Sequence, residues 1–318
     1  MRVTTFRIIA VTVLSVLMAP RVQAQGCSDA GVCTIGTVQA GFHADDSEYY
    51  DDRSPQPLRI QVQSVFGAGE NGVTILQVVP EASWTIASPI TMGTLAVKAS
   101  LPYVYATGVL KGVSTSHSGI GDAMISVSNT MAVNASTEIG VTVGTRLPTG
   151  STDASSTSGT AAGSPLPMPY QTGLGTTDLL LGASVSMDAW AVALGYQHVL
   201  QNGNSNAYVD DGEGYFTSKD LVRGNDAVAR LTYTLSAWDV SITPSLLAIY
   251  RLQADRVEGA EVAGSRGLTL NAAIAGRYML SRSVDLRVDL AMPLIIRDVR
   301  PDGLTRAFVA AVTIGVAL

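Results

Sequence analysis

Residues 284–292 read Val284-Asp285-Leu286-Arg287-Val288-Asp289-Leu290-Ala291-Met292, with an apolar side chain at every even position and a charge at positions 285, 287 and 289. Successive side chains of a β-strand point to opposite faces, so this stretch predicts a strand with one apolar and one charged face. Such a charged face is hard to place in the core of a β-sandwich. The pattern is typical of a transmembrane β-barrel strand, whose outer face meets lipid and whose inner face meets water.

The same alternation recurs along the chain, most clearly in 95–105 and 139–147. Most of the segments reach the length of about 9–11 residues that a tilted strand needs to cross a membrane. The predicted strands are 58–66, 73–86, 94–106, 121–133, 137–147, 176–187, 190–201, 226–235, 238–251, 267–280, 284–297 and 305–318. We therefore predict an all-β fold, a transmembrane antiparallel up-and-down β-barrel of about 12 strands that occupies residues 58–318.

The connectors between these segments alternate in length. Short connectors are 87–93, 134–136, 188–189, 236–237 and 281–283, and long ones are 107–120, 148–175, 202–225 and 252–266. Outer-membrane barrels have short periplasmic turns and longer outer loops. With 67–72 and 298–304 as short outer loops, we expect both termini on the periplasmic side.

Aromatic residues mark both predicted rims, as in barrels with a girdle at each membrane interface. Three tryptophans are predicted at the periplasmic rim, and four tyrosines toward the outer rim. The members of this predicted girdle are Trp84, Trp190, Trp238, Tyr103, Tyr105, Tyr196 and Tyr250.

The composition and the first residues indicate an exported membrane protein. The chain is 47% hydrophobic and only 14% charged, yet no apolar run after the N-terminus has the length of a membrane-spanning helix. Residues 1–24 read as a signal peptide, with Arg2 and Arg7 before an apolar run and a small-x-small cleavage pattern at its end. A net charge of −6 disfavours nucleic acid as a partner.

Residues 25–57 fit no strand and form an acidic, tyrosine-bearing segment. Export to an oxidising compartment predicts a local disulfide between Cys27 and Cys33. A lipoprotein with Cys27 acylated is the alternative, but the residues before Cys27 lack the usual recognition box. The segment is either a periplasmic tail or a plug that folds into the barrel.

Because side chains alternate between the two faces of a strand, the position of each residue in its strand (strand parity) predicts which side chains line the lumen. The candidates carry both signs of charge: Arg59, Gln61, Gln63, Gln77, Glu81, Lys98, Arg146, Asp178, Arg230, Asp239, Arg251, Arg277, Asp285, Arg287, Asp289 and Arg297. One interpretation is a mutually paired polar filling, because buried charges need neutralisation. The other is a hydrated pore whose charges select solutes.

Two further features suggest chemistry only weakly. His198 near the outer rim allows the hypothesis of an outer-membrane lipid hydrolase, although a histidine there is more often an interfacial side chain. The run Asp210-Asp211-Gly212-Glu213-Gly214 superficially resembles a calcium loop but lacks the remaining ligand positions. We expect no catalytic residue, no metal and no cofactor.

Three short motifs carry a family resemblance: Gly119-Ile120-Gly121-Asp122, Arg146-Leu147-Pro148-Thr149-Gly150 and Gly173-Leu174-Gly175. In their order and spacing the chain resembles the outer-membrane transport family of the meta-pathway of phenol degradation, which is distantly similar to long-chain fatty-acid transporters. Physically, Gly119 and Gly121 allow a tight turn or bulge, and Asp122 can cap backbone N–H groups there.

The resemblance implies a passive outer-membrane channel for small hydrophobic or aromatic compounds. The expected partners are outer-membrane lipid, those solutes and, during biogenesis, the barrel-assembly machinery. A structural or surface-binding barrel with a filled lumen is the alternative, and the lipid hydrolase is the third.

Overall fold

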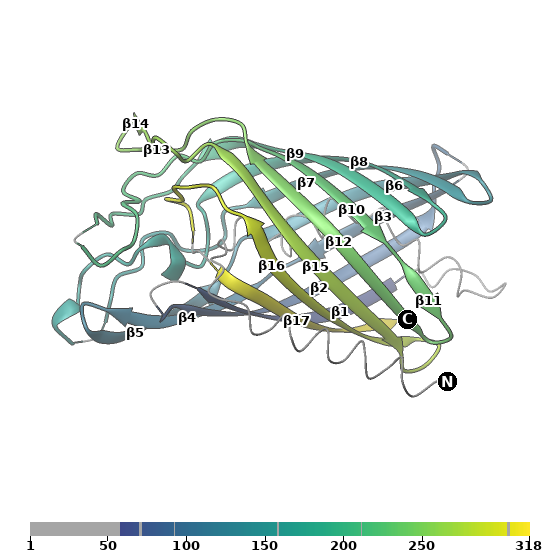
Figure 1. Ribbon diagram of the computed structural model, residues 1–318, viewed down its shortest axis with the longest axis horizontal. Helices are drawn as coiled ribbons and strands as arrows, with labels where there is room; N and C mark the ends of the chain where they lie inside the picture. The colour runs from purple at the N-terminus through teal and green to yellow at the C-terminus, as the bar shows by residue number, and fades with distance from the viewer. Residues whose placement is uncertain (1–57, 70–71, 92, 158, 211, 304–305) are drawn as a thin grey trace.

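The computed structural model shows a closed antiparallel β-barrel of 12 strands (Figure 1). It describes residues 58–318 apart from 70–71, 92, 158, 211 and 304–305. The predicted signal peptide, the segment 25–57 and the Cys27–Cys33 pair lie outside the described residues. The predicted all-β barrel and its number of strands are confirmed.

Each strand pairs with its neighbours in the sequence, and β1 pairs with both β2 and β17 to close the barrel. The barrel strands are β1 (Leu58–Gly69), β2 (Thr74–Ala87), β3 (Gly93–Ser100), β4 (Tyr103–Leu110), β5 (Val113–Ile120), β6 (Ala123–Asn134), β7 (Thr137–Leu147), β8 (Thr176–Met187), β9 (Trp190–Asn202), β10 (Asp226–Tyr233), β11 (Leu235–Ala237), β12 (Val240–Arg251), β15 (Gly267–Met279), β16 (Val284–Ile295) and β17 (Arg306–Ala317). In three cases two short elements continue one another and act as one barrel strand: β3 with β4, β5 with β6, and β10 with β11.

The prediction of a long outer loop at 107–120 is wrong. The strand predicted at 94–106 continues to Leu110 and returns as β5, so most of the predicted loop is a β-hairpin. Its turn is Lys111–Gly112, and both residues have positive φ, the backbone that a two-residue hairpin turn requires. The long strand is interrupted at Pro102, which has no N–H to donate to a ladder.

Two other strands begin or end at different residues from those predicted. The strand expected from Trp238 begins at Val240, because Trp238 and Asp239 form the turn between β11 and β12. Trp238 has a positive φ and is 89% exposed. Arg297 was predicted within the eleventh strand, but β16 ends at Ile295, so Arg297 belongs to the following loop.

All long loops lie at one end of the barrel, which we call the loop end (Figure 1). The tight turns lie at the other end, which we call the turn end. The loop end carries the β4–β5 hairpin and the connectors 148–175, 203–225, 252–266 and 296–305. Two short 3-10 helices, Gly159–Ala161 and Met168–Tyr170, lie in the first connector, and the hairpin β13 (Arg256–Val257) and β14 (Ala260–Glu261) lies in the third. The described chain starts and finishes at the turn end, where the Leu318 N–H donates to the Leu58 carbonyl at 2.8 Å.

The outward-facing positions of the strands carry exposed Leu, Ile, Val and aromatic side chains, such as Val141, Leu194 and Leu290. None of the helices in the described part of the chain has the length and hydropathy to cross a membrane. Of the predicted girdle, Trp84, Trp190 and Trp238 lie near the turn end. The four tyrosines lie toward the loop end, and all seven aromatic side chains are exposed.

Candidate lumen and its loop closure

The inward faces of the strands near the turn end carry paired charges. The Lys98 ammonium lies 3.0 Å from the Glu81 carboxylate, which also accepts a hydrogen bond from Gln61 at 2.7 Å. Across the barrel wall, the Asp285 carboxylate accepts from Arg59 and, at 3.2 Å, from Arg277. These charges come from strands far apart in the sequence, and barrel closure brings them together.

The other lumen candidates follow the same pattern. Arg287 makes a two-atom contact with Asp289 on its own strand, with a shortest distance of 2.7 Å. On β7 and β8, Arg146 lies 3.3 Å from Asp178, which also accepts from Gln197 on β9 at 2.5 Å. Gln63, Gln77 and Arg230 also lie on inward strand positions, whereas Asp239 is exposed in a turn.

Two parts of the inward face are apolar. On β12, Leu247 and Ile249 are buried and pack with Val228 of β10. On the strands that close the barrel, Val65, Val309 and Ala311 are buried against one another, with Ala291 beside them. We call these seven residues the apolar band.

At the loop end, connectors 148–175 and 203–225 pack on the inward faces of β2 and β4. Their buried apolar contacts are Leu166, Tyr170, Tyr208 and Tyr215 against Val73, Ile75, Val104, Ala106 and Leu110 of the β2–β4 region. The Tyr170 and Tyr215 rings meet edge to face at 6.0 Å. Burial raises the pKa of both phenols, so they remain neutral hydrogen-bonding groups.

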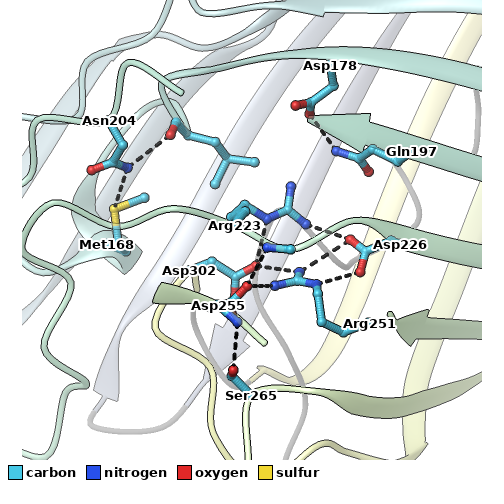
Figure 2. A network of polar contacts seen from close by, with 12 residues as sticks. Met168, Asp178, Gln197, Asn204, Arg223, Asp226, Arg251, Asp255, Ser265 and Asp302 are labelled. Atoms are coloured by element: carbon cyan, nitrogen blue, oxygen red, sulfur yellow. Dashed lines mark hydrogen bonds and ion pairs between the residues drawn. The ribbon is translucent and has the colours of Figure 1, made fainter. Parts of the chain in front are cut away.

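A buried ionic network fixes connector 203–225 on its other side (Figure 2). We call it the loop latch, and its members are Arg223, Asp226, Arg251, Asp255, Arg297 and Asp302. Each of these side chains is at most 3% exposed. Three arginines face three aspartates, so the latch is balanced in charge, as burial requires.

Arg251, the last residue of β12, lies at the centre of the latch. Its guanidinium donates to Asp226 at 2.5 Å, to Asp302 at 2.9 Å and to Asp255. Arg223 contacts Asp226 at 2.8 Å and Asp302 at 2.9 Å. The latch therefore joins the connector 203–225 to the connectors on either side of β15 and β16.

The pKa values of the latch carboxyls follow from their surroundings. Burial alone raises the pKa of Asp302, but the guanidinium groups of Arg297, Arg251 and Arg223 hold its pKa well below its usual value. Burial and the charge of Asp302 raise the pKa of Asp255. A lowered carboxyl pKa adds stability that is present above the ordinary carboxyl pKa and is lost only in stronger acid. Asp302 therefore supports the latch at neutral pH.

The three short motifs that carry the family resemblance meet at one point of the structure. The Asp122 carboxylate accepts the N–H of Gly150 at 3.1 Å and the N–H of Leu174 at 2.8 Å. It thereby holds both ends of connector 148–175. Gly150 and Gly173 touch backbone to backbone, and a Cβ on Gly150 would lie 2.7 Å from Gly173 atoms. Any side chain there would push the ends apart.

Asp122→Ala is expected to release this clamp, because two partly buried N–H groups lose their charged acceptor, at a cost of up to about 1–3 kcal/mol each. The expected result is faster amide hydrogen exchange across 148–175 with an intact barrel. Asp122→Asn is the matched variant: its amide keeps one carbonyl oxygen, so we expect an intermediate effect. Equal exchange in wild-type protein and Asp122→Ala would contradict the clamp.

His198 and the acidic run 210–214, which suggested a hydrolase and a calcium loop, both make ordinary local contacts. The side-chain partner of His198 is the hydroxyl of Tyr196, 3.4 Å from its Nδ1, and both side chains belong to the outer face. In the acidic loop, Asp210 accepts the N–H of Gly212, and Glu213 accepts the N–H of Lys111. Among the described residues, no three metal-ligating side chains form a group that would hold an ion.

Sequence reasoning missed Arg223, Asp226, Asp255 and Asp302 as members of a site, because each lies in or beside a loop. The only signal is that charges of both signs recur beside the ends of strands at the loop end. The inward packing of Tyr170 also has no periodic signal, because it depends on a connector that crosses the barrel mouth.

Comparison with known proteins adds a likeness in fold. No protein-family model matches the chain, and no curated protein matches it in sequence. Its structure is similar to that of an outer membrane channel from Pseudomonas putida F1, with a TM-score of 0.61, 15% identity, and coverage of 85% of this chain and 98% of that one. This likeness shows a shared barrel fold, and the specific family stays a resemblance.

Two other barrels are similar at lower TM-scores. The NanC porin has a TM-score of 0.45, 10% identity, and coverage of 81% of this chain and 98% of that chain. The CymD monoaromatic hydrocarbon channel has a TM-score of 0.41, 11% identity, and coverage of 90% and 94%.

Proposed function

We propose that this protein is a passive outer-membrane channel for small hydrophobic or aromatic compounds. The observation that carries the proposal is the apolar band, because inward positions of a barrel that served only water and ions would be polar throughout. Leu247, Ile249 and Val65 instead place apolar side chains on the inward side of the wall, each at most 6% exposed in the closed arrangement of the loops. The shared fold with an outer membrane channel supports the same proposal.

The closed arrangement of the loops favours a second candidate, a barrel with a filled lumen and a structural role. Connectors 148–175 and 203–225 pack into the mouth through Tyr170 and Tyr215, and the loop latch fixes the second of them there. For the channel, these loops are a gate that opens; for the structural barrel, they are a permanent cap.

Uptake of N-phenylnaphthylamine, a neutral aromatic probe whose fluorescence rises in lipid, distinguishes the two candidates. Cells that produce the protein are expected to take up the probe several-fold faster than cells that produce Leu247→Gln/Ile249→Gln at the same level of folded barrel. Heat-dependent gel mobility measures that level. A large hydrophilic dye, which both cell types should exclude, controls for a damaged membrane. Equal uptake by the two cell types would favour the structural barrel.

A further inference from the structure

One side of the lumen carries more positive than negative charge. Among the described residues, strands β1, β10, β15 and β16 contribute four arginines and two aspartates to its inward face, apart from the latch. We call them the arginine wall, and its members are Arg59, Arg230, Arg277, Arg287, Asp285 and Asp289. Among the described residues, the latch and the pairs Lys98–Glu81 and Arg146–Asp178 are balanced, whereas the wall has two more arginines than aspartates.

The register of the strands concentrates these cations. Arg277 of β15 lies directly opposite Arg287 of β16. Like charges directly opposite each other destabilise a sheet, and here each arginine also contacts an aspartate of β16, Asp285 or Asp289. Arg230 of β10 donates to Ser245 at 3.2 Å and lies near enough to Arg287 to interact electrostatically.

One member of the wall, Arg287, is accessible from inside the barrel. The Arg287 side chain is 40% exposed, although its strand position faces inward. Its guanidinium therefore meets the space of the lumen while it also contacts Asp289. A planar guanidinium matches a carboxylate with two parallel hydrogen bonds, which makes arginine better suited than lysine to this ligand.

Next to the arginine wall, toward the loop end, lies the apolar band. On β10, Val228 occupies the next inward position from Arg230 toward the loop end. On β12, Leu247 is the register partner of Arg230. A molecule with an acidic group at one end and an apolar body would place the acid at the arginines and, once the loops open, the body along the band, which is buried in the closed arrangement.

We infer that the lumen binds small amphipathic carboxylates, of the aromatic monocarboxylate class, with the carboxylate at the arginine wall. The inference rests on the proposed channel function and names its preferred substrate class. Arg287 and Arg230 hold the carboxylate, and the apolar band holds the ring. A neutral analogue of the same size uses only the band and binds more weakly.

The test compares 2-naphthoate with the neutral 2-naphthalenemethanol, by fluorescence titration of the purified full-length protein. Wild-type protein is expected to bind naphthoate more tightly than the alcohol. Arg287→Gln should weaken naphthoate binding about tenfold, the range of one charged hydrogen bond, and leave the alcohol unchanged. Arg287→Lys keeps the charge without the planar fork and should restore part of the loss. Arg230→Gln is a second, independent variant.

Arg256→Gln is the matched control, because it removes an arginine whose side chain is 58% exposed in a loop hairpin. Heat-dependent gel mobility shows whether each variant is folded. If Arg287→Gln and Arg230→Gln bind naphthoate as wild-type protein does, or lose both probes equally, the carboxylate site is wrong and the channel proposal stands. If wild-type protein binds neither probe, both proposals fail.

Discussion

Arg251→Met is expected to open the loop end of the barrel without unfolding the barrel itself. Methionine has similar length but no charge, so three buried aspartates of the latch would face only two arginines. Removing one partner of a buried ion pair costs roughly 3–5 kcal/mol, because the remaining charge stays buried and unbalanced. The strand ladders do not depend on this side chain, so the free-energy loss should appear as opening of the connectors.

Hydrogen exchange of peptides from 203–225 and 252–266 measures this opening. If exchange follows the opening equilibrium, that cost corresponds to an increase of about 100-fold or more. Lys219→Met is the matched control in the same loops: its ion pair with Glu258 is exposed on both sides, and such pairs contribute about 0–1 kcal/mol. If Arg251→Met and Lys219→Met exchange alike, the latch does not hold the loops.

Leu290→Arg is expected to impair assembly of the barrel in a lipid bilayer. Leu290 lies in the middle of β16, faces outward and is 43% exposed, beside Ile274 of the neighbouring strand. An arginine facing lipid near the bilayer midplane costs about 2–4 kcal/mol, because its charge loses hydration there. Folding yield into vesicles, measured by heat-dependent gel mobility, should fall.

Leu294→Arg is the control on the same strand and the same face. Leu294 is 52% exposed but lies near the loop end of β16, where the cost falls to about 0–1 kcal/mol at the membrane interface. Near-normal assembly of Leu294→Arg beside poor assembly of Leu290→Arg is therefore expected. Equal yields of the two variants would mean that this face of β16 does not meet lipid.

The alternation of side chains along a strand predicts which residues of the candidate site face inward, but not which of them touch. Parity placed Arg59 and Asp285 on inward faces, but their contact joins the first strand to the second-last one, so no local pattern predicts it. The hairpin within 107–120 has no clear sequence signal, because its turn, Lys111–Gly112, lacks the usual asparagine or aspartate before the glycine.

The sequence by itself determined the barrel class, the number of strands and the division between an apolar and a polar face. These follow from a period of two residues, which a strand imposes on every side chain along it. Only the tertiary structure decided the closed loop end, the Asp122 clamp and the latch. Their partners lie far apart in the chain, with Arg251 contacting Asp302, and loops have no period that fixes the direction of a side chain. Barrel closure brings such groups together, and their burial then requires that opposite charges meet.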